Sequence, residues 1–415
     1  MGLRITIIRC IYILCNKEIY GRYMRQFLIF VMQAFYTIVA NMIDDGFANR
    51  MGVDTIVAYG SYIPIIWAVQ SFNNIGKYAY TNTMKHAKTC LGIGLAMTSI
   101  VMMITIPCYR LIGTIYDLTP IQMDIFNKLV LCYLITVPLR TIGDFLYLDL
   151  MYKFENKKVV INDILFWVTN ICLDTIVFIL KFPSWCLVLT TAVAYFVSDI
   201  YLVKNSGILK ERFKLSAVRE LLKHGFNIVF DRIVGKVATL IYCSLASKMP
   251  EGKYAIHCVV YIIICNMEEF TNNFNIYCRA RIDGVKRGAR IGGNILLKNY
   301  GALLITIEYA ISMLLLVIYH GDVSFISCLP WLFLYLTDSM SLIVYENRKA
   351  VLSVYGKTEY LRFGGLVGVL VRVPYTFLVY YLGWGLFGFG IACTLDFLAR
   401  AIYFNIVIKR YESKV

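Results

Sequence analysis

Long apolar runs separated by short polar and charged stretches dominate the chain. Several of these runs contain no charged residue at all, such as residues 27–43, 55–76, 89–109 and 182–198. A helix that crosses the hydrocarbon core of a bilayer needs about 20 mostly apolar residues, so runs of this length predict transmembrane helices. The pattern continues along the chain and predicts twelve spans, at residues 25–45, 55–80, 89–115, 121–151, 159–180, 185–203, 224–248, 254–281, 299–320, 323–346, 360–382 and 386–409.

The composition agrees with an all-α polytopic membrane protein and excludes other classes. Hydrophobic residues make up 59% of the chain and charged residues only 16%, whereas soluble domains carry about 25% charged residues. A disordered or fibrous chain is excluded for the same reason. The formal net charge of +15 would indicate nucleic acid as the partner of a soluble protein, but in a bilayer protein it concerns topology. We therefore expect membrane lipids, and no nucleic acid, as partners.

Cysteine and histidine do not indicate a cofactor. The 13 Cys are odd in number, many lie within apolar runs and none form a Cys-x-x-Cys motif, while the four His are far apart. A disulfide framework, a zinc site and a haem site are therefore not expected. Nor does the chain show the positioned His or carboxylate motif of an intramembrane acyl- or glycosyltransferase. We expect a monomer that is not an enzyme.

Lys and Arg lie mostly on one side of the predicted membrane. Of the 41, 29 fall in the N-terminal arm, in loops after even-numbered spans and in the C-terminal tail. Six fall in loops after odd-numbered spans, and six lie within spans. Because basic loops stay in the cytoplasm, this bias predicts that both termini are cytoplasmic, in a multi-pass protein of the plasma membrane.

A weak internal repeat divides the chain into two similar halves. A shift of 198 residues pairs Ala48, Met51, Phe72 and Asn74 with Ala246, Met249, Phe270 and Asn272. Two six-helix bundles related by pseudo-two-fold symmetry suit alternating access, because a site between them can open to either side. We predict a basic N-terminal arm (1–24), an N-terminal six-helix lobe (25–203), a cytoplasmic linker (204–223), a C-terminal six-helix lobe (224–409) and a cytoplasmic tail (410–415).

Three segments resemble the multidrug and toxic-compound extrusion (MATE) family of transporters. The first two spans contain MIDDGFANRMGVDTIVAYGSYIPI, with Asp44, Gly52, Ala58 and Gly60 at the spacing of the family's signature. The fifth span contains NICLDTIVF, similar to the family's Asn-x-x-x-Asp, and residues 369–404 resemble its last two spans. The resemblance implies the fold just described and ion-coupled transport, within a superfamily that also holds polysaccharide and lipid-precursor flippases.

Polar residues at one depth of the first half form a candidate cation site. Asp44 and Asp174 lie six and seven residues before basic residues of outer loops, which places both roughly 10 Å below the surface. Asn170 lies one turn from Asp174, and Thr190 and Thr191 reach the same depth in span six. These oxygens suit a hard cation such as Na⁺, or a carboxylate pair that holds one proton. The resemblance implies that Asp44, Asn170 and Asp174 are the cation site.

A structural alternative is that Asp45 marks the water boundary and that Asn170 and Asp174 only join helices. Intramembrane carboxylates are usually functional, which favours the cation site. The repeat puts Arg372 at the equivalent depth of the second half. Because a guanidinium there would repel a cation, we expect the site only in the first half.

Other charges within the spans are candidates for the substrate cavity, and internal pairing is the alternative interpretation. These residues are Asp231, Arg232, Lys236, Glu268, Glu269 and Arg372. Two i,i+4 pairs, Arg140 with Asp144 and Asp396 with Arg400, are interpreted as structural ion pairs. Gly364 and Gly368 form a Gly-x-x-x-Gly motif typical of helix packing.

Two functions fit these features. The first is a secondary transporter that exports amphipathic, cationic organic compounds in exchange for Na⁺ or H⁺, which needs the carboxylate site. The second is a flippase for a lipid-linked anionic saccharide precursor, in which Arg232, Lys236 and Arg372 would bind a pyrophosphate head. The chain carries both the carboxylates and the basic residues, and the two hypotheses remain open at this stage.

Overall fold

A computed structural model describes residues 17–83, 85–153, 155–282, 288–319, 321–357 and 359–412, in which every regular element is helical. The predicted N-terminal arm falls mostly outside these ranges, and its residues 17–24 already belong to the first described helix. Residues 413–415 of the predicted tail also lie outside them, since the last helix continues to Glu412. The cytoplasmic arm (1–24) and tail (410–415) stay predictions.

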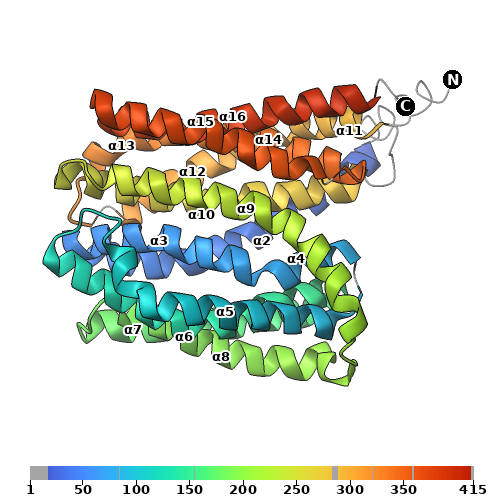
Figure 1. Cartoon of the computed structure of the whole chain (residues 1–415), viewed down its shortest axis with the longest axis horizontal. Coiled ribbons are helices and arrows are strands. Elements are labelled where there is room, and N and C mark those ends of the chain that lie inside the picture. Colours follow the sequence, from blue (N-terminus) through green and yellow to red (C-terminus); the bar gives the residue numbers. More distant parts are fainter. Residues whose placement is uncertain are drawn as a thin grey trace. The chain divides into compact units, whose positions relative to one another are not determined.

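Each predicted span coincides with one helix or with two consecutive helices (Figure 1). In the first half of the chain these are α2 (Lys17–Arg50), α3 (Val53–Asn73), α4 (Ile75–Thr83), α5 (Ala87–Gly113), α6 (Pro120–Tyr152), α7 (Asn156–Ile179) and α8 (Cys186–Ser206). In the second half they are α9 (Val218–Ala246), α10 (Glu251–Ile282), α11 (Ala289–Leu296), α12 (Ala302–Tyr319), α13 (Phe325–Tyr335), α14 (Thr337–Val354), α15 (Glu359–Leu382) and α16 (Gly385–Glu412). A π-helical turn, Leu297–Gly301, joins α11 to α12.

The connection between α8 and α9 is shorter than the predicted linker. Only residues 207–217 separate the two helices, and they include the 3-10 turns Ile208–Lys210 and Leu215–Ala217. The two helices overlap the predicted linker at both ends, where basic residues lie on their terminal turns, and residues 204–223 as a cytoplasmic linker stay a prediction. Charged side chains tolerate a helical backbone, so a charged stretch marks the membrane surface better than it marks a helix end.

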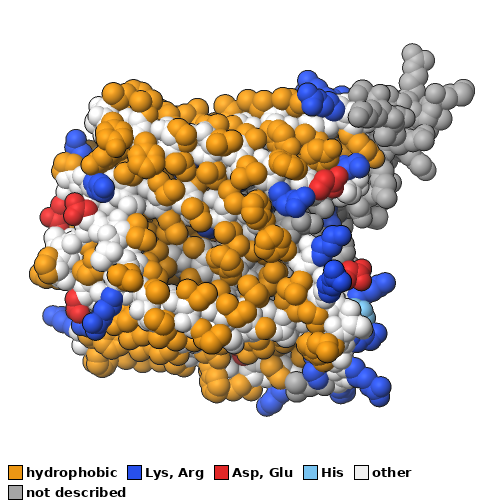
Figure 2. Space-filling view, in the orientation of Figure 1, with side chains coloured by type: hydrophobic (Ala, Val, Ile, Leu, Met, Phe, Trp, Pro, Cys, Tyr) orange, Lys and Arg blue, Asp and Glu red, His pale blue; other side chains and the backbone are white. Residues whose placement is uncertain are grey.

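The chain is a multi-pass membrane protein. Among the described residues, eight helical segments are long and apolar enough to cross a bilayer, at residues 87–113, 120–151, 157–179, 186–206, 289–319, 325–354, 359–382 and 385–412. Large apolar side chains point outward from them: Met103 on α5 is 68% exposed and Leu370 on α15 is 73% exposed. Figure 2 shows hydrophobic side chains over the helix flanks and most Lys and Arg at helix ends. A surface of this kind suits lipid rather than water.

The chain divides by its internal contacts into two compact units. Unit 1 contains residues 1–41, 260–318 and 324–415, and unit 2 contains residues 42–259 and 319–323. In unit 2, α8 packs against α6 and α7, α5 against α6, and α4 against α9; in unit 1, α16 packs against α14 and α15. The predicted lobes at 25–203 and 224–409 remain a prediction, because units defined by close packing need not follow a sequence repeat.

The Gly-x-x-x-Gly motif of α15 packs against α16, as expected. A Cβ atom at Gly364 would clash with the ring of Phe404, and one at Gly368 would clash with Asp396 and Arg400. The two helices can approach closely only because these positions carry no side chain. The interpretation of the motif as a packing motif is confirmed.

Candidate cation site

Three helices bring the predicted cation-site residues to one end of unit 2. Asp44 lies six residues before the end of α2, Asp174 five before the end of α7, and Thr190 four after the start of α8. Gly52, between α2 and α3, has φ of +111°, a conformation that favours glycine. Gly60 lets α3 approach α10, because a Cβ atom there would lie 2.6 Å from Cβ of Cys258. The signature glycines therefore shape the backbone around the site.

The carboxyl groups of Asp44 and Asp174 lie within hydrogen-bonding reach of each other, and polar side chains surround them. The amide nitrogen of Asn170 donates to Oδ1 of Asp44 at 2.6 Å and to Oδ2 of Asp174 at 2.8 Å. The hydroxyl of Thr191 donates to Oδ2 of Asp44 at 2.9 Å, and that of Thr190 donates to Oδ1 of Asp174. The structure therefore brings together all five residues singled out in the sequence.

The site is buried, and one of its amide oxygens accepts no hydrogen bond. Asp174 is fully buried, Asn170 is 2% exposed and Thr190 is 7% exposed, whereas Asp44 is only partly buried. The side-chain oxygen of Asn170 has no hydrogen-bond partner. Two carboxylates close together repel each other unless a proton or a cation lies between them. The chemistry of the cluster therefore suits one positive charge, and Asp44 is its most exposed carboxyl group.

The chemistry of the donors suits Na⁺ or H⁺ better than a transition metal. Every ligating atom here is an oxygen, which hard cations prefer. In the described residues no group of three or more His, Cys, Asp or Glu is arranged to hold a metal ion. The donors from Asp44, Asn170, Asp174 and the two Thr fit Na⁺, and a single proton would satisfy the carboxyl pair equally well.

Asp45 does not mark the water boundary. Its side chain is 6% exposed, and it accepts a hydrogen bond from the hydroxyl of Tyr319 at 3.4 Å. Asp44, its neighbour, is the residue that meets Asn170 and Thr191. These hydrogen bonds do join helices. They do so around two buried carboxylates, which would be a costly arrangement if joining helices were their only role.

The basic residues of α9 lie over aromatic rings of unit 2. The guanidinium of Arg232 lies 5.0 Å from the ring centre of Tyr78, and Nζ of Lys236 lies 4.1 Å from that of Trp67. Both side chains are partly buried. Asp231 lies one residue before Arg232 on α9, but its side chain is outside the described part of the chain. Such cation–π contacts hold positive charge without neutralising it.

Some charged residues within the predicted spans of unit 1 are buried and interact with one another. Nη1 of Arg372, which is 4% exposed, lies 3.7 Å from Oδ2 of Asp396. Arg400 makes two hydrogen bonds to the same carboxylate, which confirms the predicted i,i+4 pair. Glu268 and Glu269 are partly buried on α10. The carboxylate of Asp396 is therefore the counterion of two guanidinium groups, those of Arg372 and Arg400.

Two further carboxyl groups of unit 1, those of Glu308 and Asp338, are buried. Glu308 is fully buried and accepts from the hydroxyl of Thr271 at 3.0 Å. Asp338 is 5% exposed and lies within electrostatic range of Glu268 and Arg372. Asp338 was missed in the sequence, although it is an ionisable residue inside a predicted span and could have been found on that ground.

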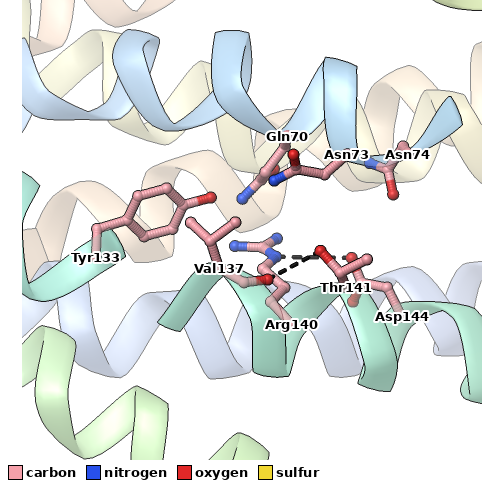
Figure 3. A pocket seen from close by; sticks show the side chains of 8 residues that line it. All are labelled: Gln70, Asn73, Asn74, Tyr133, Val137, Arg140, Thr141 and Asp144. Carbon is pink, nitrogen blue, oxygen red and sulfur yellow. Dashed lines mark hydrogen bonds and ion pairs between the residues drawn. The ribbon is translucent and has the colours of Figure 1, made fainter. Parts of the chain in front are cut away.

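A second polar group of unit 2 was also missed. The amide of Gln70, with its oxygen turned toward α6, accepts from the Tyr133 hydroxyl at 3.0 Å and from Nη1 of Arg140 at 2.6 Å. Arg140 also lies 3.6 Å from Asp144, as predicted for that i,i+4 pair. These side chains line a pocket together with Asn73, Asn74, Val137 and Thr141 (Figure 3). Only the pairing of Arg140 with Asp144 could be read from local spacing.

Comparison with known proteins identifies the class of fold. No family model matches the chain, and no curated protein is similar to it in sequence. Solved structures do match over nearly the whole chain, and their common fold is that of the MATE transporters of the MOP superfamily. The resemblance to the MATE fold, expected from the signature residues, is confirmed, while the twelve spans and the orientation of the termini stay predictions.

Three of these structures show the range of the superfamily. The inward-facing structure of a multidrug resistance MATE family transporter has a TM-score of 0.73 at 12% identity and covers 91% of this chain and 95% of that chain. The lipid II flippase MurJ, in an inward closed conformation, has a TM-score of 0.67 at 11% identity and covers 92% and 87%. A MOP superfamily transporter from Pyrococcus furiosus, for which a reversed polarity of the binding pocket suggests a different function, has a TM-score of 0.66 at 14% identity and covers 94% and 95%. At these identities the likeness concerns the fold.

Proposed function

We propose that the chain is a secondary active transporter that exports amphipathic, cationic organic compounds in exchange for Na⁺ or H⁺. The observation that carries this proposal is the convergence of Asp44, Asn170, Asp174, Thr190 and Thr191 on one buried pair of carboxyl groups. Its support is that the same chain has the fold of transporters. The ion and the organic compound are the substrates, and no resident cofactor takes part.

The proposed coupling follows from electrostatics. A Na⁺ ion or a proton between Asp44 and Asp174 relieves the repulsion of the two carboxylates and stabilises the conformation in which they are close. Loss of the ion favours a conformation that separates them. An ion that binds one conformation better than the other shifts the equilibrium between them, and this differential affinity is what coupling to the organic compound requires.

The proposal includes an arrangement in the membrane. Twelve spans form two six-helix lobes related by a pseudo-two-fold axis, with both termini in the cytoplasm, and the protein lies in the plasma membrane as a monomer. The supporting observations are the internal repeat, the distribution of Lys and Arg, and the eight helical segments already apolar enough to span. Alternating access then needs only a movement of one lobe against the other.

The test uses purified protein in liposomes loaded with ethidium, a cationic dye. An imposed Na⁺ or pH gradient should drive ethidium movement against its own gradient. Replacing Asp44 or Asp174 by Asn should abolish the ion dependence, because a neutral amide cannot exchange a proton or balance a cation. Asp124→Asn is the control, since Asp124 is an exposed carboxylate paired with Lys128. Ion-driven transport by Asp44→Asn at the wild-type rate would refute the coupling role of the pair.

A flippase for a lipid-linked anionic saccharide precursor is the second candidate function. The specific observation in its favour is the placement of two basic side chains, Arg232 and Lys236, one turn apart on α9 and over the aromatic rings of Tyr78 and Trp67. The shared fold with the lipid II flippase agrees with it. Substituting both residues by Gln while retaining ethidium export would separate the two functions. Loss of precursor translocation without loss of dye export would assign Arg232 and Lys236 to the flippase function.

A further inference from the structure

A buried carboxylate at the other end of unit 2 has no partner. Asp199 on α8 is 6% exposed, and neither of its carboxyl oxygens has a hydrogen-bond partner in the described chain. It faces α6, where a Cβ atom at Gly143 would lie 2.6 Å from its Oδ1. An ionised carboxylate buried in this way costs several kcal/mol. Asp199 therefore requires a proton or a cation.

Asp199 lies near the carboxyl group of Asp144 but accepts no hydrogen bond from a basic side chain. The titratable and charged groups around it are Asp144 and Arg140 of α6 and Tyr195 of its own helix. Arg140 is already engaged by Asp144 at 3.6 Å and by Gln70. On α7, the nearest comparable carboxylate, Asp163, accepts from the hydroxyl of Tyr147 at 3.3 Å. Asp199 differs from these residues in lacking a donor.

The position of Asp199 is opposite to the cation site within the unit. Asp199 lies seven residues before the end of α8 and Asp144 eight before the end of α6, whereas Thr190 lies near the start of α8. Nine residues separate Thr190 from Asp199, or roughly 13 Å along the helix. Along α8, Asp199 therefore lies toward the end opposite to the one at which Thr190 meets the cation site.

A row of packed tyrosine rings leads from the Asp44–Asp174 pair toward Gln70 and Arg140. Tyr59 lies within electrostatic range of Asp44 and Asp174, and its ring is 5.7 Å from that of Tyr62. The ring of Tyr62 is 5.8 Å from that of Tyr133. All three tyrosines are buried, so their hydroxyl groups lie away from lipid and bulk water.

The row continues through polar side chains of the pocket in Figure 3. Tyr133 donates to Gln70, Gln70 accepts from Arg140, and Arg140 pairs with Asp144. The free space in this pocket suffices for about one water molecule. Its polar lining supplies the two to four partners that a buried water needs. A space of this size favours water over an organic substrate, whose pockets typically exceed about 300 Å³.

We propose that Asp199 and Asp144 form a second proton site of unit 2, through which the Asp44–Asp174 site exchanges protons with water at the opposite end of the unit. Asp199 carries the proton as a neutral carboxyl group. The O–H bond of that group breaks when the proton passes to water, and the carboxylate left behind takes the next proton arriving along the pocket. Arg140 keeps its charge throughout and remains paired with Asp144. This inference rests on the proposed ion coupling at Asp44 and Asp174.

The first readout does not depend on transport. Infrared spectra of the purified protein should contain a protonated-carboxyl signal that disappears in Asp199→Asn and persists in Asp163→Asn. Asp44→Asn should leave this signal in place, because the two sites are separate. An unchanged signal in Asp199→Asn would overturn the proposal. Loss of the signal on adding Na⁺ at constant pH would also overturn it, since the site would then hold a metal cation.

The second readout separates this inference from the proposed function. In liposomes, pH-driven ethidium movement by Asp199→Asn should fall by at least about a hundredfold, the lower end of what a positioned proton-transfer group contributes. Exchange of ethidium at equal pH should continue, since it needs no net proton movement, and Asp199→Glu should restore the pH-driven rate. Asp144→Asn provides a second variant should Asp199→Asn fold poorly. Wild-type pH-driven rates in both Asn variants would refute the second proton site, whereas wild-type ion dependence in Asp44→Asn would refute the proposed function itself.

Discussion

At the scale of residues, the cation site depends on one amide that serves two carboxyl groups. Asn170 donates to both Asp44 and Asp174 through the same nitrogen, an arrangement possible only where the two carboxyl groups almost touch. Its oxygen remains without a partner. Asn170 is therefore both a structural donor and a ready oxygen ligand for Na⁺, and these two roles can be separated by a double-mutant cycle.

Replacing Asn170 by Ala should destabilise the wild-type protein by about 2 kcal/mol, because two buried carboxyl groups lose a donor. The same substitution in an Asp44→Asn, Asp174→Asn background should cost less than about 1 kcal/mol, since the carboxylates that needed the donor are gone. Thermal unfolding in detergent measures both values. Equal costs in the two backgrounds would show that Asn170 does not act on the carboxyl pair.

At the scale of helices, close approach depends on positions without side chains, and buried charge depends on complete pairing. Gly60 admits α10 against α3, and Gly368 admits the Asp396–Arg400 pair against α15. Once helices are that close, a charge between them is shielded from water and needs a partner in fixed geometry. Asp396 meets this need with two guanidinium groups, those of Arg372 and Arg400.

Replacing Gly60 by Ala should destabilise the packing of α3 against α10. The new methyl group would lie 2.6 Å from the Cβ atom of Cys258, so the helices must separate, at a cost of about 1–3 kcal/mol. Gly252→Ala is the matched control: it is also a glycine of a helix, but a Cβ atom there meets nothing within 4 Å. We expect a lower melting temperature for the first variant and an unchanged or slightly higher one for the second.

Replacing Asp396 by Asn should destabilise unit 1 by about 3–5 kcal/mol, because Arg372 and Arg400 would keep their buried charge and lose its counterion. Asp124→Asn breaks another i,i+4 pair, with Lys128, whose side chains are 62% and 50% exposed, and an exposed pair of this kind is worth about 0.5 kcal/mol or less. Denaturation in detergent should separate the two variants clearly. Similar losses would mean that Asp396 is solvated in the membrane protein.

At the scale of the whole molecule, the charge distribution predicts which loops face the cytoplasm. Lys210 lies in the basic connection between α8 and α9, and Lys253 lies at the start of α10, on the predicted outer side. Both side chains are exposed, so cysteines introduced there would be open to reagents from the adjoining water.

A membrane-impermeant maleimide added to intact cells should label Lys253→Cys and leave Lys210→Cys unlabelled until the cells are opened. The reason is that basic loops are retained in the cytoplasm during insertion. The unsubstituted protein is the control, because it shows how far its own cysteines react. Labelling of Lys210→Cys from outside intact cells would invert the predicted topology.

The local sequence pattern alone was sufficient to predict the helices and one part of the candidate cation site. Hydropathy located spans such as 121–151, which the structure shows as α6, because a helix in lipid satisfies its own backbone and needs only a sufficiently long apolar run. The spacing of Asn170 and Asp174 placed both on one face of a helix for the same local reason. Ion pairs at i,i+4 were predictable as well, as Asp396 with Arg400 shows.

Only the tertiary structure decided which side chains of neighbouring helices interact. Nothing in the local pattern distinguishes Thr190 from Thr191, yet one donates to Asp174 and the other to Asp44. Nor does the sequence show that Asp199 has no partner, whereas Asp396 has two. The sequence by itself determined that the chain is a multi-pass membrane protein and which of its segments form helices, because these depend on hydropathy along the chain. Which side chains meet depends on the rotation and separation of helices, and those follow from packing along their whole lengths.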